Sequence, residues 1–171
     1  MIRRGAEGFT LLEVLIAAFV LGIGLLGVAG LQSISLSLNQ GSYTRSQATI
    51  LARDIADRMR ANNRGVSNDA YDMGGGASPS ETTSCNATAG CNTGAMAAND
   101  LYEWRQQVSG TLPAGQAVVC IDATPADGTP GSPACDGAGS DYAIKIWWYS
   151  KEEDLDAGRA TNELFVTEFR P

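Results

Sequence analysis

Hydrophobic positions are concentrated in one unbroken run near the N-terminus. Residues 9–31 contain only two polar side chains, those of Thr10 and Glu13. At 1.5 Å per residue, a helix of this length would be about 34 Å long and could cross a hydrocarbon core of about 30 Å. Arg3 and Arg4 precede the run, and the positive-inside tendency places them in the cytoplasm. We therefore expect a transmembrane segment whose C-terminal end leads to the far side of the membrane.

A cleaved secretory signal is the alternative interpretation of this run. An ordinary signal has an apolar stretch of only about 7 to 15 residues, followed by a small-residue cleavage site. The run in this chain is longer and continues into further helix-like sequence after Leu31. A retained anchor is therefore favoured.

Glu13 is the one acidic residue within the run. An ionised carboxylate costs on the order of 2.5 to 3.5 kcal/mol at the bilayer centre and less near its edge. Its carboxylate either reaches the cytoplasmic interface or has a partner of opposite charge. The residues alone leave both interpretations open.

The helical period of apolar residues continues beyond the run. Spacings of three, four and seven place one apolar stripe on one helix face. The stripe consists of Leu31, Ile34, Leu38, Ala48, Leu51, Ile55 and Met59. Two opposite-charge pairs, four residues apart, lie on the wet side: Arg53 with Asp57, and Asp54 with Arg58. We expect one helix over residues 9–64, stopped by Gly65, whose second half packs on another part of the chain.

The remainder of the chain has the pattern of a small mixed domain. Gly, Ser, Asn, Ala and Thr dominate residues 65–99, which predicts a long loop. Candidate N-caps at Asn99 and Asp100 predict a short helix over 99–112. Three β-rich segments then predict an antiparallel sheet within 116–169. They are residues 117–121, 142–149 and 163–169. A long helix packed on a C-terminal antiparallel sheet is an α+β fold.

Composition and charge narrow the function. The 171 residues are about one domain's worth and 44% hydrophobic, an ordinary globular proportion. A net charge of −7 and a pI near 4.5 disfavour binding to nucleic acid. The chain has no His, the commonest general base and metal ligand. With no nucleophile motif, phosphate loop or metal cluster in the sequence, we expect no catalytic residue, no metal and no cofactor.

Four cysteines are present, Cys85, Cys91, Cys120 and Cys135. In an exported domain they predict two disulfides with three possible connectivities. Pairing Cys85 with Cys91 and Cys120 with Cys135 is preferred, because each pair brackets a Gly-rich loop. A zinc site is the alternative, but there is no His and no CxxC spacing.

The N-terminus resembles that of type IV pilins and of type II secretion pseudopilins. The resemblance rests on the string GFTLLE at residues 8–13, preceded by a short basic leader and followed by the apolar run. It implies that residues 1–8 are a leader removed by a prepilin peptidase, and that the new amino terminus on Phe9 is methylated. It also implies that Glu13 neutralises the amino terminus of a neighbouring subunit in a filament, since neither charge alone is comfortable in an apolar core.

One position departs from the pattern of many major pilins. They carry a helix-kinking proline at the twenty-second mature position, where this chain has Gly30. No ring therefore forces a kink there. With Gly22, Gly24 and Gly27 nearby, the glycines alternatively form a close-packing face for another membrane helix.

Within the family the chain is most similar to minor pilins of the PilV class, notably in residues 27–32, 45–52 and 54–62. The resemblance implies a minor pilin that joins a complex priming pilus assembly at or near the filament tip. The alternatives are a minor pseudopilin of type II secretion and a pilus-borne adhesion or DNA-uptake module.

The partners implied are other minor pilins, the major pilin, the prepilin peptidase, the inner membrane and a tip adhesin. The protein would lie in the inner membrane, with a periplasmic head, before it enters the pilus at the cell surface. The expected domains are the leader 1–8, a transmembrane and filament-core segment 9–31, a periplasmic half-helix 32–64 and a globular head 65–171.

Overall fold

The chain forms two compact units, Met1–Gln40 and Gly41–Pro171, which we call the stem and the head. The computed structural model describes residues 8, 10–88, 90–154 and 159–170. The stem contains the first part of helix α1 (Leu11–Ala61), and the head contains the rest of that helix and all other elements.

Helix α1 begins directly after Thr10. The backbone N–H of Glu13 donates to the Thr10 hydroxyl at 3.3 Å and to its carbonyl at 3.1 Å, as expected of an N-cap. The long N-terminal helix of the predicted fold is confirmed.

The predicted end of this helix at residue 64 is wrong. α1 ends at Ala61, and a separate short helix, α2 (Asn63–Ser67), follows. The Asn62 side chain caps α2 by accepting from the Gly65 N–H at 3.3 Å. Gly65 is therefore not a helix stop but a buried residue inside α2, where a Cβ atom would lie 2.5 Å from the Asn62 amide nitrogen.

The apolar stripe of α1 divides at the boundary between the units. In the head its residues are buried, together with their small neighbours. The buried set is Ala48, Leu51, Ala52, Ile55, Ala56 and Met59. In the stem, by contrast, Leu31, Ile34 and Leu38 are 59–69% exposed.

Helix α3 (Thr93–Thr111) begins six residues before the predicted short helix, inside the predicted loop. Asn92 is its N-cap and accepts from the Ala95 N–H at 2.8 Å, so neither Asn99 nor Asp100 caps the helix. The Trp104 indole N–H donates to the Leu51 carbonyl of α1 at 2.8 Å, which ties the two helices together. A 3-10 turn, η1 (Thr83–Asn86), lies in the segment between α2 and α3.

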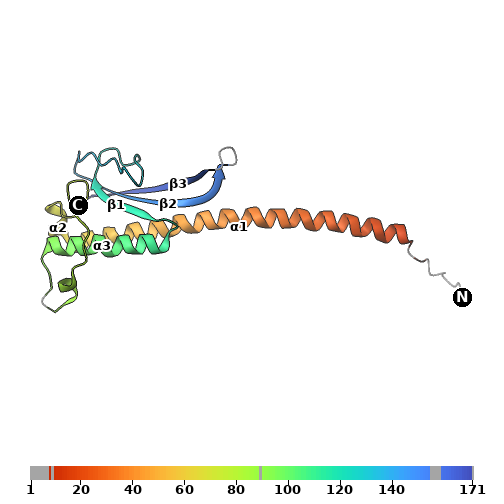
Figure 1. The fold of residues 1–171 in the computed structure, drawn as a ribbon, viewed down its shortest axis with the longest axis horizontal. Coiled ribbons are helices and arrows are strands. Elements are labelled where there is room, and N and C mark those ends of the chain that lie inside the picture. Colours follow the sequence, from red (N-terminus) through yellow and green to blue (C-terminus); the bar gives the residue numbers. More distant parts are fainter. Residues whose placement is uncertain (1–7, 9, 89, 155–158, 171) are drawn as a thin grey trace. The chain divides into compact units, whose positions relative to one another are not determined.

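The sheet has three antiparallel strands in the order β1-β2-β3, which confirms the α+β prediction (Figure 1). They are β1 (Gln116–Ile121), β2 (Tyr142–Asp154) and β3 (Arg159–Phe169). The last two are longer than expected from the sequence. β2 continues through the charged residues after Tyr149, where the sequence predicted no strand.

The two faces of the sheet are covered differently. Tyr142, Ile144, Ile146 and Trp148 alternate along β2 and join the core formed with α1 and α3. The opposite face carries Lys145 and Trp147, and the connection from β1 to β2 lies over it (Figure 1). The core of the described residues lies entirely between Ala48 and Phe169, so the head contains its own core.

Candidate functional site

The predicted processing site lies at the start of the stem. Gly8 is exposed, with open space around it. Phe9 and residues 1–7 lie outside the described residues, so cleavage after Gly8 and methylation of Phe9 remain predictions.

Glu13 occupies the third position of α1 and is exposed. The sequence from Thr10 to Glu13 fits a capping box, in which a Ser or Thr caps the helix and a Glu follows three residues later. A carboxylate in the first turn also interacts favourably with the helix dipole, by about 0.3 to 1 kcal/mol at an exposed site. Glu13 thus has a local role in starting α1, which the sequence analysis did not consider.

The described surface of the stem is largely apolar from Leu11 to Leu31. Large apolar side chains are exposed from Leu11, at 83%, to Leu31, at 69%. α1 is the one helix among the described residues that is long and apolar enough to cross a membrane, and none of the apolar window that qualifies it is buried in the structure. The predicted transmembrane segment and this exposed surface therefore coincide.

Both disulfides have the preferred local pairing. Cys85 is bonded to Cys91 and Cys120 to Cys135, with Cα atoms 4.7 and 6.0 Å apart. Cys120 and Cys135 also lie close to Asp122, a group that could in principle hold a metal. Because the two sulfurs are bonded to each other, they are not available as the thiolates of the zinc alternative.

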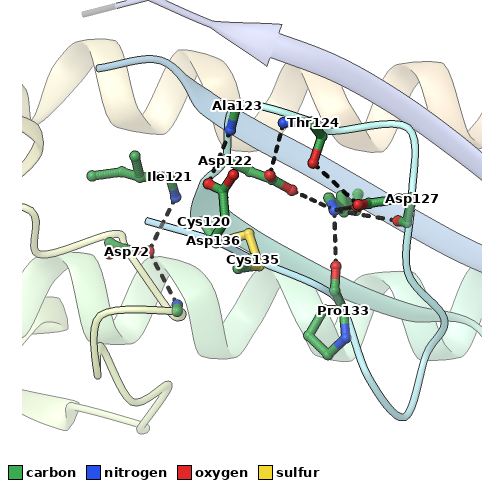
Figure 2. Close-up of a disulfide and its surroundings, with 12 residues drawn as sticks. Asp72, Cys120, Ile121, Asp122, Ala123, Thr124, Asp127, Pro133, Cys135 and Asp136 are labelled. Carbon is green, nitrogen blue, oxygen red and sulfur yellow. Dashed lines mark hydrogen bonds and ion pairs between the residues drawn. A yellow bond between two sulfur atoms is a disulfide. The ribbon is translucent and has the colours of Figure 1, made fainter. Parts of the chain in front are cut away.

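The Cys120–Cys135 disulfide closes a loop that holds a buried charge (Figure 2). Lys145 is fully buried, and its Nζ atom lies 2.5 Å from the Asp122 carboxylate and 2.9 Å from the Asp127 carboxylate. It also donates to the Pro133 carbonyl at 2.8 Å. The loop residues therefore supply the polar partners that a buried ammonium requires.

Lys145 and the loop carboxylates shift one another's pKa values. Burial lowers the pKa of Lys145, but the hydrogen bonds and negative charges of Asp122 and Asp127 outweigh burial and leave it raised. The hydrogen bond from Lys145 in turn lowers the pKa of Asp127. Sequence reasoning missed this cluster. The sequence shows a lysine at an alternating position of an apolar strand, after a loop with several Asp residues, but this pattern alone does not predict burial.

A second charge cluster joins α1 to α3. Arg58 lies 3.0 Å from Asp54, as predicted, and also contacts Glu103 at 2.9 Å and Asp100 at 3.6 Å. The hydrogen bond from Arg58 lowers the pKa of Glu103, whereas burial raises the pKa of Asp100. These contacts orient the two helices.

The other predicted ion pair on α1, Arg53 with Asp57, does not form. Asp57 pairs with Arg60, three residues later, and not with Arg53. The Arg60 guanidinium also lies over the Phe169 ring, 5.4 Å from its centroid. Arg53 is exposed and has no ion-pair partner among the described residues.

These features define a class of protein: a membrane-anchored subunit with an unburied apolar stem and a self-contained α+β head. Comparison with known families identifies the class more closely. Residues 3–29 match the prokaryotic N-terminal methylation motif, and residues 30–102 match the family described as type IV pilin Tt1218. No curated protein and no solved structure matches the chain.

The two family matches adjoin and together span residues 3–102. Over these residues the chain is therefore similar to the processing motif and the helical region of type IV pilins, which indicates a component of a pilus or a pseudopilus. The similarity is to a family of structural subunits. The methylation motif and the apolar N-terminal helix fit a location in the inner membrane and then in the pilus.

Proposed function

We propose that this chain is a minor pilin of the PilV class, which joins other minor pilins in a complex that primes type IV pilus assembly at or near the filament tip. The observation that carries the proposal is the contrast within α1, whose stem residues are exposed and apolar while the head is already packed.

The stem needs a partner outside the molecule. Exposed apolar patches of more than a few hundred Å² are rare on soluble monomers and mark surfaces that contact a membrane or other proteins. Before assembly the lipid bilayer would cover the stem, and after assembly the stems of neighbouring subunits would do so. A filament built from such stems therefore has an apolar core.

Glu13 would place a carboxylate in this apolar core. Cleavage after Gly8 would create a positive amino terminus on Phe9, four residues before Glu13 in the chain. In an apolar core, the amino terminus of one subunit and the carboxylate of the next would each be costly alone and favourable as a pair. Pairing between subunits would then align one stem with the next.

The assignment to minor pilins is supported by the residues that resemble the PilV class. Residues 45–52 and 54–62 supply the buried part of α1 and the Arg58 cluster, so the resemblance covers the packing of α1 on α3. The net charge of −7 counts against a DNA-uptake module. A minor pseudopilin of type II secretion is the second candidate, because its N-terminal motif is the same.

Blocking the processing site tests the proposal. Gly8→Val should leave the protein uncleaved in the membrane, remove it from sheared filaments and lower the number of pili per cell. Gly5→Val, the same change at the other glycine of the leader, is the matched control and should behave like the unchanged protein. In the unchanged protein, mass spectrometry should find methylated Phe9 as the first residue. An uncleaved Gly8→Val protein with a normal number of pili would contradict the proposal.

The same strains separate the two candidates. A minor pilin should be present in sheared pili in far fewer copies than the major pilin, and its loss should leave type II secretion unchanged. Lost secretion with normal pili would identify a pseudopilin.

A further inference from the structure

The two edges of the sheet differ in whether another segment covers them. The outer edge of β1 is covered, because the Met73 N–H donates to the Val119 carbonyl at 2.9 Å and the Ile121 N–H donates to the Asp72 carboxylate at 3.1 Å. β3 is the other edge strand, and within the described ranges no segment pairs with its outer side. Residues 163–167 of this strand are accordingly only half-buried.

A groove runs beside this open edge, between β3 and the part of α1 that lies in the head. It has a volume of about 290 Å³. Its apolar lining comes from Ala52, Ala56, Ile144, Phe165 and Phe169. The polar residues Thr49 and Thr167 and the charged residues Arg53, Arg60 and Glu168 also line it.

The open edge decides what kind of segment fits the groove. Any partner that covers β3 removes water from its outer N–H and C=O groups, which then need hydrogen-bond partners. A helix uses its own backbone groups internally and would leave those of β3 unsatisfied. An extended segment would pair with them, as in strand addition to an exposed sheet edge.

The exposed guanidinium of Arg53 favours a segment that carries a negative charge. Arg60 is already paired with Asp57 and packs on Phe169, whereas Arg53 has no ion-pair partner in the part of the chain that the structure describes. A partner that covers Arg53 must supply a counter-charge, because a guanidinium removed from water without one is costly. A carboxylate would satisfy it.

A second copy of the chain is a poor occupant. Two β3 edges can face each other only through a two-fold axis. With antiparallel pairing of the strands, the α1 helices of the two copies would run in opposite directions. Two chains anchored in the same membrane, or assembled in the same filament, have their helices in the same direction.

We propose that the edge of β3 and the groove beside it bind an extended segment from the head of another pilin subunit. The segment's backbone pairs with β3, one of its apolar side chains enters the groove, and one of its carboxylates lies against Arg53. This inference rests on the proposed function, because the partner is another subunit of the filament.

Site-specific photo-crosslinking in cells that assemble filaments tests the contact. A benzoylphenylalanine at position 167 should form a crosslink to another pilin subunit, and mass spectrometry should map it to an extended segment that contains Asp or Glu. The same group at position 107, an exposed residue of α3, is the control. A yield no higher than the control, a crosslink to a helix, or a crosslink to a second copy of this chain would overturn the inference.

Charge reversal tests the role of Arg53. Arg53→Glu should reduce the crosslink at position 167 by about tenfold or more, equivalent to about 1.4 kcal/mol or more, because a charge-assisted hydrogen bond is lost. Arg105→Glu, the same change at an exposed position of α3, should leave the yield unchanged. An equal effect of both changes would show that only net charge matters, and the groove would have no specific role.

Two adjacent prolines test backbone pairing. Neighbouring residues of a strand direct their N–H groups to opposite sides, so either Val166→Pro or Thr167→Pro removes only an outward donor and the other removes a donor to β2. With the crosslinker at position 165, the variant that keeps its melting temperature should lose the crosslink. A retained crosslink in that variant would contradict strand pairing, and if both variants unfold, the Arg53→Glu result decides.

The amount of protein in sheared filaments separates this inference from the proposed function. A protein that is present in filaments but gives no crosslink at position 167 refutes the groove alone. A protein that never enters filaments refutes the proposed function.

Discussion

Apolar side chains of the same helix are exposed in the stem and buried in the head. Along α1, Ile34 is 61% exposed in the stem and Ile55 is fully buried in the head. Both belong to one apolar stripe with one period. The difference shows that periodicity identifies a face that needs a partner but does not say whether the partner lies in the same chain.

The head also pairs its buried charge internally. Its buried Lys145 ammonium is paired within the head, with the buried carboxylate of Asp122 and with Asp127. The stem carries Glu13 within its apolar sequence, where a partner from another molecule is expected. The comparison therefore predicts that changes in the head act on folding and changes in the stem act on assembly.

The largest effect on folding is expected from Lys145→Met. Removing one partner of a buried ion pair leaves the other charge uncompensated and typically costs about 3 to 5 kcal/mol. The double change Lys145→Met with Asp122→Leu should recover most of this loss. Thermal unfolding of the full chain in detergent, followed by tryptophan fluorescence, measures both, because all three tryptophans lie in the head. A double variant no more stable than the single one would show that the ion pair is not the cause.

The two isoleucines of α1 test the comparison directly. Ile55→Ala should cost about 2 to 5 kcal/mol of head stability, as for other large-to-small changes in a core. Ile34→Ala should change head stability by less than about 0.5 kcal/mol, as for an exposed position. The pair is matched in chemistry and in helix, so equal effects in the same unfolding experiment would mean that the stem packs on the head.

The elements that were predicted and those that were missed differ in the range of the interactions that define them. The stem, the stripe from Ala48 to Met59 and the strand cores follow from local periodicity, and the structure contains them. The break after Ala61 depends on Asn62, whose amide also donates to the Thr93 carbonyl at 2.8 Å, 31 residues away. Such a contact has no local signal.

The start of α3 was missed for a different reason. The segment after Asn92 is rich in Gly and Ala and so has the composition of a loop, although alanine is also the best helix former. An Asn before such a segment was a usable N-cap signal. The burial of Lys145 was not predictable, because alternation along β2 assigns it to the outer face and only the three-dimensional path of the β1–β2 loop covers it.

The disulfides should differ in their effect on the head. The Cys120–Cys135 bond closes 15 residues, and the chain-entropy model gives about 3 kcal/mol for a loop of that length. Cys85–Cys91 closes only 6 and should contribute less. Replacing each pair by Ser and comparing thermal unfolding measures the difference. A larger loss for the Cys85 and Cys91 pair, or free thiols detected by alkylation in the oxidised protein, would contradict this account.

A smaller effect is expected from pH. The pKa of Glu103 is lowered from its ordinary value of 4.5 by the hydrogen bond from Arg58, so its contribution to stability is present above pH 4.5 and is lost as pH falls through its folded pKa. Its carboxylate is partly exposed, so the loss should stay below about 1 kcal/mol. Glu103→Gln should flatten the decline in melting temperature below pH 4.5, whereas Glu81→Gln, at an exposed position, should not. An unchanged slope would show that the pair does not contribute.

The smallest effect on folding, and the sharpest test of the comparison, is expected from Glu13→Gln. The change removes a charge that is costly in a bilayer, so insertion of the stem and the melting temperature of the head should be unchanged. The hypothesis that Glu13 pairs with the amino terminus of a neighbour predicts less of this protein in sheared pili and fewer pili per cell, with normal membrane levels. Glu7→Gln, in the leader, is the matched control, because that carboxylate would be removed with the leader before assembly.

A subunit at the outermost tip has no neighbour above it, so a nearly silent Glu13→Gln would place the protein there. Reduced membrane levels would instead mean that the carboxylate serves insertion or the start of α1, where Thr10 and Glu13 form the first turn, and the pairing hypothesis would be wrong.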